Sequence, residues 1–252
     1  MPICIAGFGL YRHLVHTHSS NQVSRWLIAV IEGMERMKLQ LALDEFDLEQ
    51  SLALAQRVRE YVDIIEIGTP FVIRCGVEAV RAFVEAFPEK EILADLKIMD
   101  GGYFETVLAL DAGASYVTVL GVTDDATIKG CYDAVREHGG SLVVDMVCVG
   151  DLTERVVECE VLGADVLAVH TGVDQQTQGR TPLDDLRVMK AAAQSAKVAV
   201  AGGISSSTIE EYLALDPDIV IVGGAISHAD DPVAEARAIK LAMENAHKSR
   251  KE

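Results

Sequence analysis

Eight short β-rich apolar runs, spaced along the chain from Met37 onward, restrict the possible fold more than any other feature of this sequence. Segments with the apolar spacing of amphipathic helices lie between them, and this alternation indicates parallel βαβ units. Eight regular units of about 25 residues match a closed (β/α)₈ barrel, or TIM barrel, better than an open doubly wound sheet. The predicted strands are 39–44, 62–68, 91–97, 115–121, 141–147, 164–170, 197–203 and 218–224.

The helical segments support the same α/β fold class. The clearest of them are 48–60, 77–87, 125–138, 152–162, 184–196, 206–215 and 232–245. No linker or change of composition divides the sequence after Met37. We therefore predict a single barrel domain over residues 37–252.

Residues 1–36 differ from the rest, because they contain three closely spaced histidines and no clean hydrophobic period. His13, His16 and His18 could bind a metal, but accidental spacing in a loose tail is the simpler interpretation. We predict an N-terminal extension that is not part of the fold. Since the first strand begins directly after Met37, our hypothesis is that the native start is Met37, or Met34, and that the preceding residues are a translated leader.

The charge balance limits the partners of this chain. Asp and Glu number 39 against 22 Lys and Arg, for a net charge of −17, so neither nucleic acid nor an anionic membrane is expected to bind. The run WLIAVIEGM is too short to span a bilayer. Five scattered cysteines fit free thiols in a reducing cytoplasm. A phosphorylated small molecule remains a possible ligand, because it needs only local N–H groups or one cation.

Ionisable residues stand at the predicted C-terminal ends of the strands. In a (β/α)₈ barrel the active site is built at these ends, where the βα loops meet. We therefore expect seven side chains to converge on one rim: Asp44, Glu66, Asp95, Lys97, Asp100, Asp145 and His170.

The run LADLKIMDGG, residues 93–102, is the densest part of this set. The period of two along a strand points both Asp95 and Lys97 into the barrel, either as catalytic groups or as a buried ion pair. Asp100 follows the strand and can turn elsewhere, toward a neighbouring subunit or into a helix cap. With Glu66 on the adjacent strand, Asp95 offers oxygen ligands suited to Mg²⁺. His170 is a candidate general base, with a satisfied core histidine as the alternative.

Glycine pairs directly follow the last two strands, and they predict a phosphate site. Glycine lets backbone N–H groups approach a ligand closely, and these two loops are the usual phosphate site of this architecture. The pairs are Gly202–Gly203 and Gly223–Gly224. Ordinary turn glycines are the alternative.

Taken together, residues 37 to about 246 resemble the 3-hexulose-6-phosphate synthases, within the orotidine-5′-phosphate decarboxylase suprafamily. The resemblance is carried by MKLQLALD, IEIGTP, ADLKIMDGGY, YVTVLGV, VVDMVCV, LAVHTGVDQQ, VAVAGGIS and VIVGGAI, and DLKIMD is the D-x-K-x-x-D signature of the suprafamily. At three rim positions where the related 3-keto-L-gulonate-6-phosphate decarboxylases typically carry Glu, Arg and Thr, this chain has Asp145, Val173 and Ala201, which resemble the synthases. That decarboxylase also tends to carry Arg where Gly224 stands.

The resemblance implies an aldehyde-lyase that condenses D-ribulose 5-phosphate with formaldehyde to D-arabino-hex-3-ulose 6-phosphate, through a 1,2-enediolate stabilised by Mg²⁺ or Mn²⁺. It also implies Glu66 and Asp95 as metal ligands, Asp44 in contact with substrate hydroxyls and Lys97, and His170 as the base.

Asp100 would reach the neighbouring active site of a homodimer. The alternatives are the decarboxylase activity itself and a non-catalytic phosphosugar-binding barrel.

Overall fold

A closed barrel of eight parallel strands forms the centre of this protein, in the order β1 to β8 around the ring. The computed structural model describes residues 36–179 and 181–249, and the expected extension lies outside them except for Arg36. The strands are β1 (Lys38–Leu43), β2 (Ile64–Ile67), β3 (Glu91–Ile98), β4 (Tyr116–Leu120), β5 (Ser141–Asp145), β6 (Val166–His170), β7 (Lys197–Ala201) and β8 (Ile219–Val222). This confirms the predicted TIM barrel and all eight strands.

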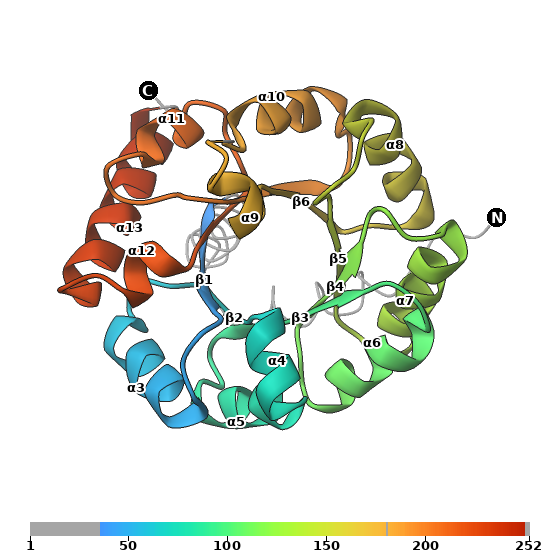
Figure 1. Ribbon diagram of the computed structural model, residues 1–252, viewed down its shortest axis with the longest axis horizontal. Helices are drawn as coiled ribbons and strands as arrows, with labels where there is room; N and C mark the ends of the chain where they lie inside the picture. Colours follow the sequence, from blue (N-terminus) through green and yellow to red (C-terminus); the bar gives the residue numbers. More distant parts are fainter. Residues whose placement is uncertain (1–35, 180, 250–252) are drawn as a thin grey trace, which may run out of the picture. The chain divides into compact units, whose positions relative to one another are not determined.

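Helices form a ring around the barrel, as Figure 1 shows in a view onto one end of it. They are α3 (Leu48–Val58), α4 (Thr69–Cys75), α5 (Glu78–Ala86), α6 (Gly102–Asp111), α7 (Asp125–His138), α8 (Leu152–Leu162), α9 (Val173–Gln176), α10 (Leu183–Ala192), α11 (Ile209–Leu213), α12 (Gly224–Ser227) and α13 (Pro232–Ser249). Among these, α4, α6, α9 and α12 follow a strand without a clear amphipathic pattern.

Two separate apolar layers hold the barrel together. The larger layer lies between strands and helices and includes Phe71, Phe83 and Ile98. The smaller one fills the barrel interior with side chains from β2 to β8, among them Leu93 and Tyr116. Because alternate residues of a strand face opposite sides, these strands contribute to both layers and still leave their last inward positions for polar groups.

A repeated contact joins the strands in pairs at their N-terminal ends. The residue before each even-numbered strand accepts the N–H of a residue near the start of the preceding strand through its side-chain oxygen, and donates its own N–H to the same residue's carbonyl. We call these contacts the strand clasps: Asp63 with Leu39, Ser115 with Ile92, Asp165 with Leu142 and Asp218 with Val198. Three of the four acceptors are aspartates, and each also pairs with a cation.

Removing a clasp is expected to destabilise the fold without changing the site. Asp165→Ala leaves the N–H of Leu142 without its acceptor at 2.8 Å and removes the ion pair to Arg136. A buried donor left unpaired costs about 1–3 kcal/mol of unfolding free energy, which urea denaturation measures. Asp165→Asn keeps the acceptor oxygen and serves as the control. An Asp165→Ala protein that unfolds at the same urea concentration as wild type would contradict this.

Candidate active site

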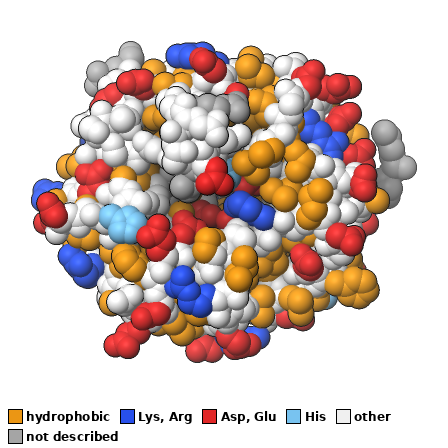
Figure 2. All heavy atoms as spheres, in the orientation of Figure 1, with side chains coloured by type: hydrophobic (Ala, Val, Ile, Leu, Met, Phe, Trp, Pro, Cys, Tyr) orange, Lys and Arg blue, Asp and Glu red, His pale blue; other side chains and the backbone are white. Residues whose placement is uncertain are grey.

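The C-terminal ends of the strands open into a cavity of about 710 Å³. Figure 2 shows carboxylates in and around a hollow near the centre of this face. Of the seven ionisable residues expected at the strand ends, six line the cavity: Asp44, Glu66, Asp95, Lys97, Asp145 and His170. Glu66 on β2 and Asp95 on β3 therefore face the same space, as their proposed role as a ligand pair requires.

Lys97 lies between two carboxylates in this cavity. Its Nζ is 2.5 Å from Oδ2 of Asp95 and 3.2 Å from Oδ2 of Asp145. Simple alternation does not describe its position, because Lys97 has φ of 47° and the β3–β4 register shifts between Ala94 and Ile98. A bulge of this kind re-aims a side chain. The end of β3 is thus distorted where its ammonium group enters the site.

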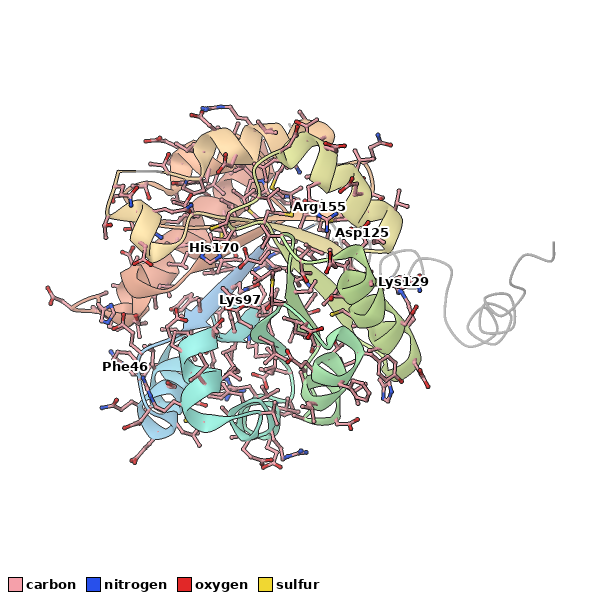
Figure 3. All side chains as sticks on the ribbon, turned by 45° about the vertical axis from the view of Figure 1, so that its right-hand side comes forward. Phe46, Lys97, Asp125, Lys129, Arg155 and His170 are labelled. Atoms are coloured by element: carbon pink, nitrogen blue, oxygen red, sulfur yellow. The ribbon has the colours of Figure 1, made fainter. Side chains whose placement is uncertain are left out.

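His170 is held by the carboxylate that also pairs with Lys97. Its Nδ1 lies 2.8 Å from Oδ2 of Asp145, while Oδ1 of Asp145 accepts the N–H of Val147 at 2.9 Å. Burial would raise the pKa of Asp145, but the hydrogen bond from His170 and the charge of Lys97 outweigh it and lower that pKa. With Nδ1 bound to a carboxylate, Nε2 is the nitrogen free to take a proton. Lys97 and His170 both lie near the centre of the strand ends in Figure 3.

Glu66 carries the most unfavourable charge of the site. It is 9 % exposed, and its Oε2 accepts a hydrogen bond of 2.7 Å from Nε2 of Gln40. Burial, followed by the negative charge of Asp95, raises the pKa of Glu66 well above its usual range. The same two causes raise the pKa of Asp44. A cation bound between these carboxylates would relieve the repulsion.

The close packing of Asp44 explains a glycine after β2. A Cβ at Gly68 would lie 2.0 Å from Oδ1 of Asp44, so only glycine leaves room for this carboxylate. The contact expected between Asp44 and Lys97 does not occur among the ion pairs of the described residues. Lys97 instead influences Asp44 from a distance, since its charge partly offsets the rise in the pKa of Asp44.

The ammonium group of Lys97 stays charged in these surroundings. Burial acts to lower its pKa, but the charges of Asp95, Asp145 and Glu66 raise it well above the ordinary value. A group so strongly held as a cation cannot serve as a base near neutral pH. It can stabilise negative charge that develops on a bound substrate.

The loops after β7 and β8 line one side of the same cavity, where the phosphate site was predicted. Ala201 and the glycine pairs Gly202–Gly203 and Gly223–Gly224 are all in contact with it. Gly202 has φ of 126°, and a Cβ there would lie 2.8 Å from the carbonyl oxygen of Thr171. Within the described part of the chain, the amides of these four glycines donate to no loop or turn acceptor of the protein. They are therefore available to an anionic ligand.

Two predicted site residues are not placed in this cavity. The expectation that all seven ionisable residues share one rim is wrong for Asp100, whose exposed carboxylate accepts the N–H of Gly101 at 2.7 Å. Gly101 has a left-handed conformation, which turns the chain into α6 and directs Asp100 away. Val173 begins α9, but its side chain lies outside what the structure describes.

Sequence reasoning missed several polar residues that line the cavity. Thr69 donates to both the carbonyl oxygen and Oδ2 of Asp95 at 2.8 Å, and Thr118 donates to its Oδ1 at 2.7 Å. His228 after α12 pairs with Glu45 at 2.9 Å at the edge of the cavity. Their position at inward-facing or loop sites beside known rim residues was the available signal. Threonine and histidine are too common in strands and loops for that signal to be specific.

A second hollow, of about 820 Å³, lies on the rim between the loops after β4 and β5. Arg155 lines it, and donates to the carbonyl oxygens of Gly121 and Thr123 and to the carboxylates of Asp125 and Glu158. Figure 3 shows Arg155 and Asp125 away from Lys97 and His170. Arg155 therefore joins two loops, and none of the residues predicted for the site lies here.

Comparison with known proteins gives consistent relatives. The model of the orotidine 5′-phosphate decarboxylase / HUMPS family matches residues 37–239. A 3-hexulose-6-phosphate synthase of Staphylococcus epidermidis is 50% identical over 208 residues, which are 82% of this chain and 99% of that protein. The synthase of Staphylococcus aureus strain MSSA476 is 45% identical over the same shares.

The solved structures agree. The 3-hexulose-6-phosphate synthase from Salmonella typhimurium is 57% identical with a TM-score of 0.82, and the match covers 84% of this chain and 100% of that one. KGPDC from Streptococcus mutans, in complex with a D-pentose 5-phosphate, is 26% identical with a TM-score of 0.77 over 83% of this chain and 98% of that one. On the family match and these identities, the chain belongs to the orotidine 5′-phosphate decarboxylase / HUMPS family.

Proposed function

We propose that this chain is a 3-hexulose-6-phosphate synthase, which condenses D-ribulose 5-phosphate with formaldehyde to D-arabino-hex-3-ulose 6-phosphate. The observation that carries the proposal is the contrast in identity: 57% to a synthase of known structure against 26% to the decarboxylases of the same fold. A pentose phosphate also fits the cavity chemistry, with free amides at one side and carboxylates at the other. The pentose phosphate bound in one relative agrees with this.

The ligand would lie across the barrel mouth. Its phosphate would accept hydrogen bonds from the amides of Gly202, Gly203, Gly223 and Gly224, with Ala201 and Val173 beside it. Asp44, at the end of β1, would bind the sugar hydroxyls. Small residues in these loops leave the amides open, because no side chain covers them.

A divalent cation fits the opposite side of the cavity. Among the described residues no group of three or more His, Cys, Asp or Glu side chains is arranged to hold a metal. Mg²⁺ does not need such a group, since it commonly takes one or two carboxylates together with waters and substrate oxygens. Glu66 and Asp95 would hold Mg²⁺ or Mn²⁺, and the raised pKa of Glu66 marks an uncompensated charge there. When bound, the cation would polarise the substrate carbonyl.

The protein's own groups then account for the proton and charge transfers. Nε2 of His170 would remove the C1 proton of ribulose 5-phosphate, with Asp145 orienting the ring. Lys97 would stabilise the oxyanion of the 1,2-enediolate. C1 would attack the carbon of formaldehyde, and the new alkoxide would take the proton back from His170. One C–C bond forms and no atom is lost.

A single assay tests this proposal. The purified chain should consume formaldehyde only when D-ribulose 5-phosphate is present, and a chelator should stop the reaction until Mg²⁺ or Mn²⁺ is restored. The control substrate is 3-keto-L-gulonate 6-phosphate, whose conversion would release CO₂. Faster CO₂ release than formaldehyde consumption would favour the decarboxylase. Binding of the phosphosugar without either reaction would favour a non-catalytic barrel.

Replacing Glu66 provides a test of the metal site that does not depend on turnover. Glu66→Gln keeps an acceptor for Gln40 but removes the buried charge, so the metal-free protein should melt at least about 2 °C higher, the shift that 1 kcal/mol produces at this size. Because the pKa of Glu66 is raised, lowering the pH through it protonates wild-type Glu66 and should shrink the difference. Mg²⁺ should raise the melting temperature of wild type and not that of the variant. A variant less stable than metal-free wild type would contradict this.

We also propose a homodimer in which Asp100 reaches the neighbouring active site. An exposed apolar surface surrounds Asp100 and consists of Met99, Phe104, Leu108 and Val122, which are 55%, 78%, 57% and 43% exposed. Side chains of this kind mark protein interfaces when they cluster. Phe104→Glu should convert the dimer to a monomer in sedimentation and reduce turnover, whereas Val161→Glu, on α8, should change neither.

The proposed domain boundary and location follow from the same comparisons. The catalytic domain would comprise residues 37–252, since the family match begins at residue 37. The described cysteines, Cys75, Cys131, Cys148 and Cys159, are free thiols, which fits the cytoplasm. No helix in the described ranges is long and apolar enough to cross a membrane.

A further inference from the structure

The hydroxyl of Thr118 on β4 connects two groups of the neighbouring strand β3. Thr118 is 5% exposed. Its Oγ1 accepts the backbone N–H of Lys97 at 2.9 Å and lies 2.7 Å from Oδ1 of Asp95. Since a backbone N–H can only donate, the single hydroxyl proton is left for Asp95. The direction of both hydrogen bonds is therefore fixed.

The first of these bonds replaces a missing backbone contact. The register of β3 against β4 shifts between Ala94 and Ile98, so Lys97 has no regular place in the ladder. Its φ of 47° is left-handed, a conformation that costs a non-glycine residue about 1–2 kcal/mol. Oγ1 of Thr118 takes the N–H of Lys97 at this point and so stabilises the distortion.

The second bond acts on the other end of the same lysine. Asp95 receives Thr118 on Oδ1, and Thr69 and the ammonium of Lys97 on Oδ2. One hydroxyl thus fixes the main chain of Lys97 directly and its Nζ through Asp95. Both contacts are lost together if the hydroxyl is removed.

We propose that Thr118 is a positioning residue that holds Lys97 in its left-handed conformation and Asp95 in its orientation. Thr118 acts through these two groups and not on the phosphate of the substrate. The catalytic consequence rests on the proposed function, because it assumes that Lys97 stabilises the enediolate. The structural part, the bond from Lys97 to Thr118, does not depend on any reaction.

The test compares Thr118→Val, Thr118→Ala and Thr118→Ser. Valine preserves the shape, alanine avoids placing a methyl group against Asp95, and serine retains the hydroxyl. We expect valine and alanine to lower kcat about 10–100-fold, with the KM for ribulose 5-phosphate within about threefold of wild type. Serine should restore kcat to within about threefold.

Amide hydrogen exchange at single-residue resolution gives a readout without substrate. The amide of Lys97 should exchange at least about tenfold faster in the valine and alanine variants, while serine keeps it protected. Other β4 amides should keep their wild-type rates. Thr106→Val, a buried change on α6 outside the cavity, is the matched control and should alter neither kcat nor the exchange of Lys97.

Each outcome separates the alternatives. Unchanged exchange of Lys97 in both Thr118→Val and Thr118→Ala would overturn the inference, as would wild-type kcat in either variant. Uniformly faster exchange across the barrel would show a merely structural role and also overturn it. A wild-type chain that consumes no formaldehyde would reject the proposed function, and the exchange measurement would still decide the position of Lys97.

Discussion

Replacing Lys97 with alanine is expected to lower kcat by about 10³-fold while the chain still binds ribulose 5-phosphate. Loss of one group that stabilises a developing oxyanion costs about 10²–10³ in rate, and this one carries a full charge. Of the described residues that line the cavity, Lys97 is the one Lys or Arg. The glycine amides remain in place, so the dissociation constant should change by less than about tenfold. Steady-state formaldehyde consumption and calorimetric titration measure the two effects.

The control for this prediction is Lys97→Arg. Arginine retains the charge, but its planar fork does not reproduce the contacts of Nζ with Asp95 and Asp145. We expect partial activity, between wild type and alanine. Because alanine leaves two carboxylates without their cation, its unfolding must be measured in parallel. Normal turnover by a folded Lys97→Ala protein would exclude the oxyanion role.

Replacing His170 with alanine should abolish exchange of the C1 proton of ribulose 5-phosphate in deuterated water. This exchange needs no formaldehyde, so it isolates the proton-transfer step. General-base catalysis contributes about 10²–10⁴-fold, which sets the expected loss. Asp145→Asn should give a smaller loss, because it disturbs the ring through Nδ1 and leaves Nε2 present. Nuclear magnetic resonance follows the C1 signal directly.

Persistence of the exchange would move the base elsewhere. Asp44 is the remaining carboxylate at the sugar side, with its pKa already raised by burial and by Asp95. Asp44→Asn should therefore keep exchange near the wild-type rate if His170 is the base. Loss of exchange in Asp44→Asn with retention in His170→Ala would reverse the assignment.

The strands were predictable from sequence because each one is a short apolar run with its own boundary. Helix α6 lacked the equivalent signal, since Phe104 and Leu108 on its exposed side are as apolar as its buried residues. A helix that is apolar on more than one side shows no amphipathic period. The feature that hid α6 from sequence analysis is the same one that supports a dimer.

The site was predictable only as far as strand alternation holds. It placed Asp95, Asp145 and His170 in the cavity, as the structure describes. It could not describe the bulge at Lys97 or the left-handed Gly101 that turns Asp100 away, because both depend on backbone torsion and neighbouring strands. Thr118 gave no signal for the same reason, since its partners lie on another strand.

The strand clasps lie at the opposite end of the barrel from every residue proposed to act on substrate. Evolution or a protein engineer can thus adjust tolerance to heat at one pole and selectivity at the other with little interference between them. A library restricted to the clasp residues and their cationic partners should yield variants with altered shelf life and the parental turnover. Independent optimisation of durability and chemistry is then a property of how the chain is wound, available before any particular reaction is chosen.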